Sequence, residues 1–165
     1  MGTASTMTAL VETMGMSLTG ASSVPAMDSR GHQLAAASGR RIVQMVWDDL
    51  KPSDIVTEAS IHNAAKVSVA LGGSTNAAIH LLAIARRAGI NFSLDDFDRF
   101  GRMVPVLANV QPSGKYIMPE FSDAGGLPAL LNNMADKLDL DCLTVNGRTL
   151  GENTLGALAE DDDVI

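Results

Sequence analysis

The stretch "ALGGSTNAAIHLLAIARRAG", residues 70 to 89, constrains the fold of this chain more than any other. Two adjacent glycines end one apolar helical run, and a second run begins at once with Ser74 or Thr75 as its N-cap. Two arginines and then Gly89 close the second run, in the order that the helix dipole and the C-cap favour. The sequence therefore predicts two helices that meet at a glycine turn.

Helical spacing of apolar residues recurs along most of the chain. It predicts an opening helix with Met7, Leu10, Val11 and Met14 on one face, and a helix over 32–50 that Gly39 weakens and that carries Leu34, Arg41, Ile42 and Met45. It also predicts a helix that Ser53 caps with Asp54 in its first turn, a short helix capped by Ser93, and a helix over 125–138 with Pro128 in its first turn.

Strand signals are few. "MVPVLANV" alternates Val104, Val106, Ala108 and Val110 as a strand does, although Pro105 restricts it to an edge or a strand start. "CLTVNGRTL" carries Asn146-Gly147 between two β-prone pieces, which predicts a hairpin with a type I′ turn. Helix outweighs strand, so the chain is either a helical domain or the helical share of a larger α/β layer.

Composition excludes several classes of protein. The net charge is -7, with 12 Lys and Arg against 19 Asp and Glu, which opposes binding to nucleic acid or to an anionic membrane. Cys142 is the only cysteine, which rules out an internal disulfide and any site built from several thiolates of this chain. Polar residues interrupt the apolar run near residue 75, and the first 29 residues lack the positive start of a signal peptide. We expect a cytoplasmic protein.

The glycine turn has two interpretations. Glycines let a ligand approach the backbone, and the N–H groups that begin the next helix, together with Ser74, Thr75 and Asn76, can receive a carboxylate or phosphate oxygen. The structural alternative is a tight helix-to-helix turn, because glycine at a C-cap and Ser or Thr at an N-cap are ordinary helix ends. The residues alone leave both open.

Other candidate sites are weaker. His32, His62 and His80 match no HExxH spacing, and we expect packing or helix-surface roles for His62 and His80. The carboxylate runs Asp48-Asp49, Asp95-Asp96 and 161–163 are expected to face solvent. "PSGKY" has Asn109 and Tyr116 where a phosphate loop needs glycine and Ser or Thr, and "GGSTN" is not a GxSxG elbow.

Five segments in order carry a resemblance. "MGTASTMTALVETMGMSLTG", "ALGGSTNAAIHLLAIARRAG", "PSGKY", "GGLPALL" and "TVNGRTLGEN" resemble landmarks of the dihydroxy-acid dehydratase and 6-phosphogluconate dehydratase family. The details are most similar to the branch that acts on sugar acids such as arabinonate or xylonate, and the branch acting on branched-chain amino acid precursors is close. The resemblance implies a hydro-lyase that converts a small-molecule 2,3-dihydroxy acid or sugar acid to a 2-keto acid, with an iron–sulfur cluster, typically [2Fe–2S], and magnesium as cofactors.

The resemblance also implies which parts of such an enzyme this chain lacks. Family chains are much longer; their cluster cysteine in this region comes just before "NTMGTAST", which falls ahead of Met1, and their serine base lies in a C-terminal β-barrel. No catalytic residue or metal ligand maps onto this chain, and Cys142 matches no ligand motif.

We therefore expect an α/β fold in which residues 1–158 are the helix-rich second part of a three-layer N-terminal domain. Residues 159–165 would be an acidic connection toward the barrel. The chain alone would be inactive and bind neither cofactor, the full-length protein would be a homo-oligomer, and Ser74, Thr75 and Asn76 would lie on the substrate side. The alternative is a free-standing, non-catalytic helical interaction module, which a stable monodisperse chain would favour, whereas exposed apolar faces favour the fragment.

Overall fold

The structure is a computed structural model that describes residues 1–165. Helices supply its regular structure, and none is both long and apolar enough to cross a membrane. Their bounds in chain order are α1 Thr3–Thr13, η1 Ala21–Ser23, α2 Arg30–Trp47, α3 Pro52–Ile55, α4 Glu58–Ala70, α5 Asn76–Arg87, α6 Leu94–Met103, α7 Met118–Asp123, α8 Gly126–Asn133, η2 Ala135–Lys137 and α9 Leu150–Thr154, where η marks a 3₁₀ helix.

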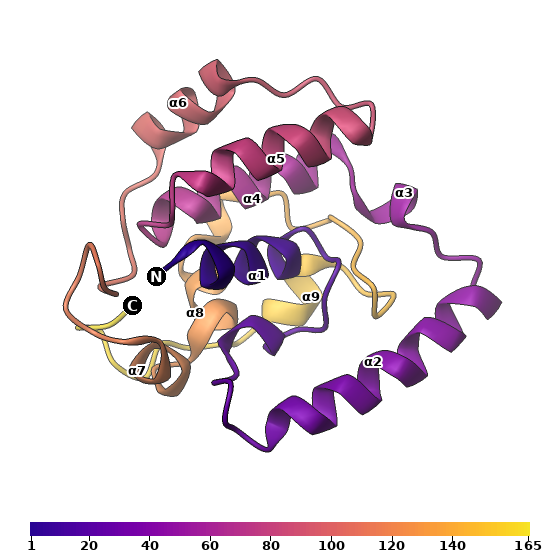
Figure 1. Ribbon diagram of the computed structural model, residues 1–165, viewed down its shortest axis with the longest axis horizontal. Coiled ribbons are helices and arrows are strands. Elements are labelled where there is room, and N and C mark those ends of the chain that lie inside the picture. Colours follow the sequence, from indigo (N-terminus) through magenta and orange to yellow (C-terminus); the bar gives the residue numbers. More distant parts are fainter.

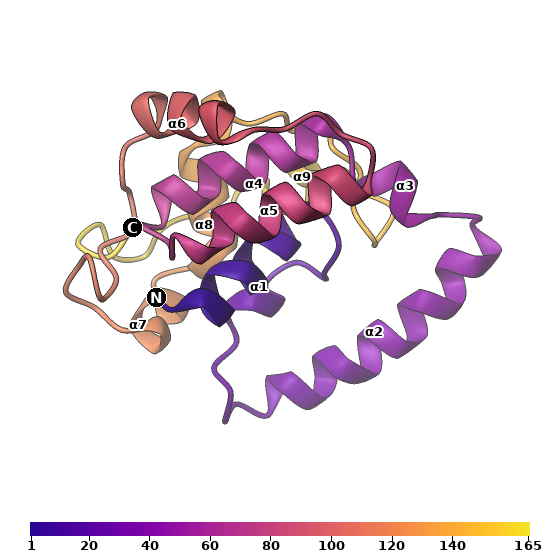
Figure 2. The same ribbon diagram turned by 45° about the horizontal axis from the view of Figure 1, so that its top comes forward.

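The core lies where α1, α4, α5 and α8 come together (Figure 1). α1 packs on both α4 and α5, and α6 lies across α4 and α5 from the other side (Figure 2). Leu10 of α1, Ile61 of α4 and Leu81 of α5 are fully buried, as are Leu127 and Leu130 of α8. Burial of these side chains is the main force that holds the helices together.

Several predicted helices are confirmed at their ends. The opening helix is α1, and α5 ends at Arg87 just before Gly89, whose φ is +75°. Ser93 caps α6 by accepting a hydrogen bond from the Asp96 N–H at 3.2 Å. Pro128 lies in the first turn of α8, but that helix ends at Asn133 and continues only as the short turn η2.

The predicted cap at Ser53 is wrong. Asp54 does lie in a first turn, but it belongs to the four-residue helix α3, where its carboxylate accepts from the Lys51 N–H at 2.8 Å. The long helix α4 begins later, with Thr57 as N-cap: its hydroxyl accepts from the Ser60 N–H at 3.2 Å, and the Ser60 hydroxyl accepts from the Thr57 N–H at 2.9 Å. These two hydrogen bonds pair N–H groups at the start of the helix that have no carbonyl partner within it.

The predicted strand over 104–110 is also wrong, because its backbone groups bond to a helix end instead of to another strand. The N–H groups of Leu107 and Ala108 both donate to the Ala70 carbonyl, at 2.8 and 3.0 Å, and Asn109 N–H donates to Val164. The chain contains no sheet, only isolated bridges such as Val110 with Tyr116. The α/β expectation is therefore confirmed only in its helix-rich part.

Asn146-Gly147 does turn the chain, but not as a type I′ hairpin. A single bridge joins Leu143 to Thr149, and the Gly147 N–H donates to the Thr144 carbonyl. Gly147 has a φ of +84°, whereas Asn146 does not take the second positive φ that type I′ requires. The Asn146 side chain accounts for the difference. Its oxygen accepts a hydrogen bond from the Thr144 hydroxyl at 2.8 Å, which holds Asn146 outside the positive-φ region.

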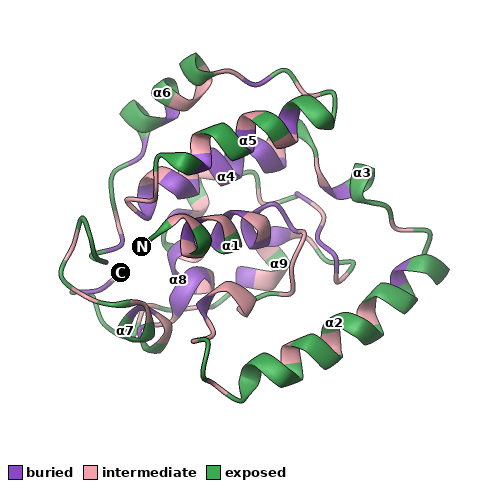
Figure 3. Ribbon diagram, in the orientation of Figure 1, coloured by how far each residue is buried: buried purple, intermediate pink, exposed green.

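α2 stands apart from the other helices (Figures 1 and 2). Gly39 does not interrupt it, but the predicted apolar face is buried only at Met45, which packs in a small cluster with Ile55 and Val145. Ile42 is 57% exposed, and most of the helix is exposed along its length (Figure 3). α2 is therefore a peripheral arm of the fold.

The packing of α5 gives a matched test. We expect Leu81→Ala to lower the free energy of unfolding by about 2–5 kcal/mol, because it removes a fully buried side chain from the core. Ile79→Ala on the same helix, where the side chain is 66% exposed, should cost about 0.5 kcal/mol or less. Urea unfolding followed by circular dichroism measures both; equal losses would show that α5 is not packed by the Leu81 face.

Candidate functional site

The turn between α4 and α5 depends on its two glycines. A Cβ at Gly72, where φ is +58°, would lie 2.5 Å from the Ser113 hydroxyl. A Cβ at Gly73 would lie 2.7 Å from the Thr6 methyl group and 3.0 Å from the Ser68 carbonyl. Side chains at these positions would push α1 and the loop of Ser113 away. The glycines therefore allow the start of α1 and the loop 111–115 to approach the turn.

Threonine hydroxyls of α1 bind the polar residues of the turn. The Asn76 side-chain amide donates to the Thr3 hydroxyl at 2.9 Å, and the same hydroxyl lies 3.1 Å from the Ser74 hydroxyl. The Ser74 N–H donates to the Thr6 hydroxyl at 3.0 Å. The turn is thus held by hydrogen bonds to α1 as well as by its own backbone.

The predicted cap of α5 is only partly formed. Thr75 occupies the N-cap position, but its side chain accepts no capping hydrogen bond and is exposed. The Ser74 hydroxyl accepts from the Asn76 N–H at 3.3 Å. The Thr75 hydroxyl is therefore free to meet a ligand, whereas Ser74 and Asn76 are already engaged with neighbours.

The third segment at this end is the loop of the "PSGKY" motif. It closes on itself, with the Lys115 N–H donating to the Asn109 side-chain oxygen at 3.0 Å and the Gly114 N–H donating to Val110. The amino group of Met1 donates to the Gln111 carbonyl, which ties the loop to the start of α1. Three motifs far apart in the sequence thus meet at one end of the molecule, beside the N label in Figure 1.

The helix dipoles at this end favour an anion, whereas the acidic run 161–163, which reaches the loop through the hydrogen bond from the Asn109 side chain to the Asp163 carbonyl, opposes one (Figure 1). α1 and α5 both begin here, and neither has an acidic residue in its first turn to offset the positive end of the helix dipole. In α5 the early N–H groups of Ala77 and Ala78 already bond to Ser74 and Thr75, so the start of α1 is the freer donor. The arrangement can bind a carboxylate or a phosphate oxygen.

Comparison with known proteins gives the family. Residues 1–153 match the family described as "Dihydroxy-acid/6-phosphogluconate dehydratase N-terminal". The chain belongs to this family. It is 52% identical over 156 residues to an L-arabinonate dehydratase of Rhizobium leguminosarum bv. trifolii, covering 93% of this chain and 27% of the relative.

Other relatives carry different substrate names. A D-xylonate dehydratase of Caulobacter vibrioides is 44% identical over 100% of this chain and 28% of its own length. A dihydroxy-acid dehydratase of Methanothermobacter thermautotrophicus is 43% identical over 99% of this chain and 30% of its own length. The chain thus spans less than a third of the length of these dehydratases.

Two of the histidines lie on α4 and α5, and His80 is one helical turn beyond Asn76. His62 packs against Phe92 in a tilted arrangement and against Phe100 edge-on, with ring centroids 6.0 and 5.0 Å away, and its burial lowers the pKa of the imidazole. Its Nε2 is 3.9 Å from the Glu58 carboxylate. His80 is exposed on α5. The expectation that His62 and His80 serve packing or a helix surface agrees with these positions.

Cys142 is a poor metal ligand or nucleophile in this setting. It is buried, and its sulfur accepts a hydrogen bond from the Asn63 side chain at 3.5 Å. Burial raises the pKa of the thiol to about 11, so the thiolate that metals bind is scarce at neutral pH. No group of three or more His, Cys, Asp or Glu side chains in the chain is placed to hold a metal ion.

Sequence analysis missed Glu12, a buried carboxylate in α1. It accepts hydrogen bonds from the Gly20 N–H at 2.5 Å and the Ser22 N–H at 2.7 Å, and so fastens the loop after α1. Burial raises the pKa of this carboxyl, and the hydrogen bonds from Ser22 and Gly20 oppose that rise. A lone Glu in "TALVETMGM" gives no sequence signal of this role, because helices carry many solvent-facing glutamates.

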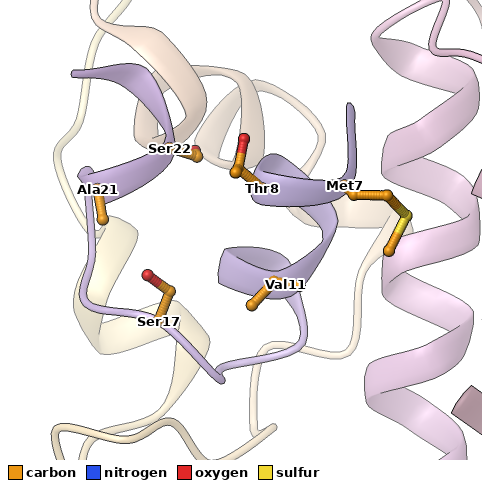
Figure 4. Close-up of a pocket in the computed structure, with 6 residues that line it drawn as sticks. All are labelled: Met7, Thr8, Val11, Ser17, Ala21 and Ser22. Atoms are coloured by element: carbon orange, nitrogen blue, oxygen red, sulfur yellow. The ribbon is translucent and has the colours of Figure 1, made fainter. Parts of the chain in front are cut away.

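A small cavity of about 240 Å³ lies between α1 and this loop (Figure 4). Apolar side chains of Met7 and Val11 form one wall, and Thr8, Ser17 and Ser22 contribute hydroxyl-bearing side chains. The Thr8 hydroxyl is already bonded to the Ser5 carbonyl at 2.9 Å. The cavity separates α1 from the loop that Glu12 holds, and it does not reach the glycine turn.

The raised pKa of Glu12 predicts a pH dependence of stability. Because the folded state holds this proton more tightly than the unfolded state, the contribution of the group is full below pH 4.5 and is lost as the pH rises through the folded value. We expect the stability of the wild type relative to Glu12→Gln to be greatest near pH 4 and to fall toward pH 7. Urea unfolding of both proteins across this range measures it. An advantage that grew with pH would mean that the two N–H donors outweigh burial.

Proposed function

We propose that this chain forms the substrate-facing end of the N-terminal domain of a hydro-lyase that dehydrates a 2,3-dihydroxy acid or a sugar acid to a 2-keto acid. The observation that carries the proposal is the meeting of the α1 start, the turn of Ser74, Thr75 and Asn76, and the loop 111–115 at one end. The family match supports the reaction class, and the 52% identity to an L-arabinonate dehydratase supports a sugar acid.

In this proposal the chain binds and orients the acid. The carboxylate of the substrate meets the N–H groups at the start of α1 and the free hydroxyl of Thr75, while the α1 and α5 dipoles favour its charge. Asn76 contributes through its side-chain amide, whose NH₂ group already donates one hydrogen bond to the Thr3 hydroxyl. The proton transfer and the loss of the hydroxyl group belong to residues outside this set.

The [2Fe–2S] cluster and magnesium that the family resemblance implies do not fit the donor set of this chain. An iron–sulfur cluster needs several thiolates, whereas the single cysteine is a buried thiol of raised pKa that accepts a hydrogen bond from Asn63. No group of three or more His, Cys, Asp or Glu side chains is placed to hold magnesium. The proposed binding and orientation of the acid therefore involve neither group. In a full-length relative, a metal acting as Lewis acid would assist departure of the hydroxyl group.

Exposed apolar side chains favour this proposal over a free-standing interaction module. Ile42, Val43, Val46 and Trp47 lie exposed on α2, more than a self-sufficient small domain usually shows in one place. In the proposed function these side chains face the remainder of the larger protein.

Binding of L-arabinonate tests the proposal directly. In ¹H–¹⁵N spectra of the labelled chain, we expect millimolar L-arabinonate to shift the amides of residues 3–5 and 74–77, without turnover of the acid. Asn76→Ala should weaken this binding about 10-fold, as expected for a lost hydrogen bond to a charged group. Asn91→Ala, at an exposed position that makes no side-chain hydrogen bond, is the control.

A second variant separates binding from structure. Thr3→Val and Asn76→Ala both remove the hydrogen bond between the two side chains, and Thr3→Val also removes the contact of the Thr3 hydroxyl with the Ser74 hydroxyl. A purely structural role of this bond therefore predicts a loss of stability for Thr3→Val at least as large as that for Asn76→Ala, with equal affinities for the acid. The proposed role predicts the same order of stabilities, with weaker binding for Asn76→Ala than for Thr3→Val. Absent shifts, or equal affinities of the two variants, would reject a substrate role for Asn76.

A further inference from the structure

Asn146-Gly147, the only Asn-Gly pair of the chain, has a reactivity that its role in the turn does not use. Because glycine has no Cβ to obstruct the approach, its main-chain nitrogen can attack the side-chain amide carbon of the preceding asparagine. The new C–N bond closes a succinimide ring, and the side-chain nitrogen leaves with the proton of the Gly147 N–H as ammonia. Water then opens the ring to aspartate, or to isoaspartate, in which the main chain runs through Cβ. Asn146 is therefore a candidate site of deamidation that needs only water.

Both ends of the Asn146 side-chain amide are held in the folded chain. Its oxygen accepts hydrogen bonds from the Thr144 hydroxyl at 2.8 Å and from the Arg148 N–H at 2.9 Å. Its NH₂ group donates to the side-chain oxygen of Asn153 in α9 at 2.7 Å, and the NH₂ group of Asn153 donates to the Thr144 hydroxyl at 2.9 Å. The side chains of Thr144, Asn146 and Asn153 therefore form a closed ring of hydrogen bonds, which we call the Asn146 clasp.

The attacking nitrogen is held as well. The Gly147 N–H donates to the Thr144 carbonyl at 2.9 Å, so the proton that must be lost on attack is bonded within the turn. The main chain on either side is also fixed, because the Thr144 N–H donates to the Arg148 carbonyl at 2.9 Å and the buried Val145 donates from its N–H to the Gly15 carbonyl at 2.7 Å. Ring closure therefore requires hydrogen bonds of both the amide and the nitrogen to break first.

We propose that Asn146 is a latent deamidation site, which the Asn146 clasp keeps unreactive in the folded chain and which reacts when the clasp opens locally. A reaction that proceeds only from an open state has a rate proportional to the population of that state. The rate at Asn146 therefore depends on the side chains of Thr144 and Asn153 more than on the stability of the whole fold. The proposal is independent of the proposed dehydratase function.

The products of deamidation cannot restore the clasp. Aspartate at this position has an oxygen in place of the NH₂ group that donates to Asn153, so two acceptor oxygens would face each other. Turning the Asn153 amide over would remove its hydrogen bond to Thr144. Isoaspartate also lengthens the main chain of the turn, next to the Val145 carbonyl that accepts a hydrogen bond from Arg41 of α2. Deamidation would therefore loosen the attachment of both α9 and α2 to the turn.

Deamidation rates of the whole 165-residue chain test the proposal. Peptide mass spectrometry after incubation at mildly alkaline pH follows the conversion of the Asn146 amide to a carboxyl group, and the same chain unfolded in urea gives the unprotected rate. We expect Asn146 of the folded wild type to react more slowly than in the unfolded chain by about 10-fold or more, because only the open state reacts.

A matched pair of variants tests the clasp itself. Thr144→Val removes the hydroxyl and keeps the shape of the side chain, and we expect it to raise the rate in the folded chain about 10-fold. Thr144→Ser keeps the hydroxyl and should react at close to the wild-type rate. Asn153→Ala, at a half-buried position, should also raise the rate and keeps the test available if Thr144→Val does not fold. Circular dichroism confirms that each variant is folded.

Leu81→Ala separates local opening from global unfolding, because it weakens the core without touching the clasp. We expect it to leave the rate of the folded chain unchanged. Rates that rise more with Leu81→Ala than with Thr144→Val or Asn153→Ala would overturn the proposal, as would equal rates in the folded and unfolded wild type. A folded chain that reacts faster than the unfolded one would also overturn it, because the donors to the Asn146 oxygen would then activate the amide.

Discussion

The rest of the structure depends on the close approach of α1 to the turn between α4 and α5. The turn can take this position only because Gly73 presents no side chain to Thr6, whose methyl group would be 2.7 Å from a Cβ. Once α1 lies there, its threonines bond to Ser74 and Asn76, and its apolar face meets α4 and α5 in the core. The apolar packing of α1 and its hydrogen bonds to the turn therefore both require this close approach at Gly73.

The sequence predicted the helix ends that are determined by interactions between residues close together in the chain. The glycine stop after α4, the Ser93 cap and the early position of Pro128 involve neighbours within one helical turn, so the sequence contains all the participants. The same reasoning identified Ser74, Thr75 and Asn76 as candidates. It did not find that Thr3 holds Asn76, because 73 residues separate the two side chains.

Sequence reasoning failed where distant backbone groups decide the structure. Apolar residues alternate over 104–110 as in a strand, but the carbonyl at the end of α4 accepts hydrogen bonds from the N–H groups of Leu107 and Ala108. A strand needs a neighbouring strand, and periodicity cannot say whether one is present. At Asn146 the side-chain oxygen accepts a hydrogen bond from the Thr144 hydroxyl, so the turn forms without a type I′ backbone. Glu12 was missed because its burial depends on a loop that folds back over α1.

The way in which Glu12 holds that loop bears on how the protein can vary among relatives. Its carboxylate binds the main-chain N–H groups of Gly20 and Ser22, which every residue except proline provides. Gly15 and Gly20, whose φ values are +83° and +82°, are restricted by their backbone conformation, and the Ser23 hydroxyl accepts a buried hydrogen bond from the Leu127 N–H at 2.8 Å. Most of the other side chains of the loop are therefore free to change during divergence as long as these residues and the glutamate persist. Across the family we expect a variable surface anchored by a few fixed positions, and a comparison of the variable side chains alone would misjudge the loop as dispensable.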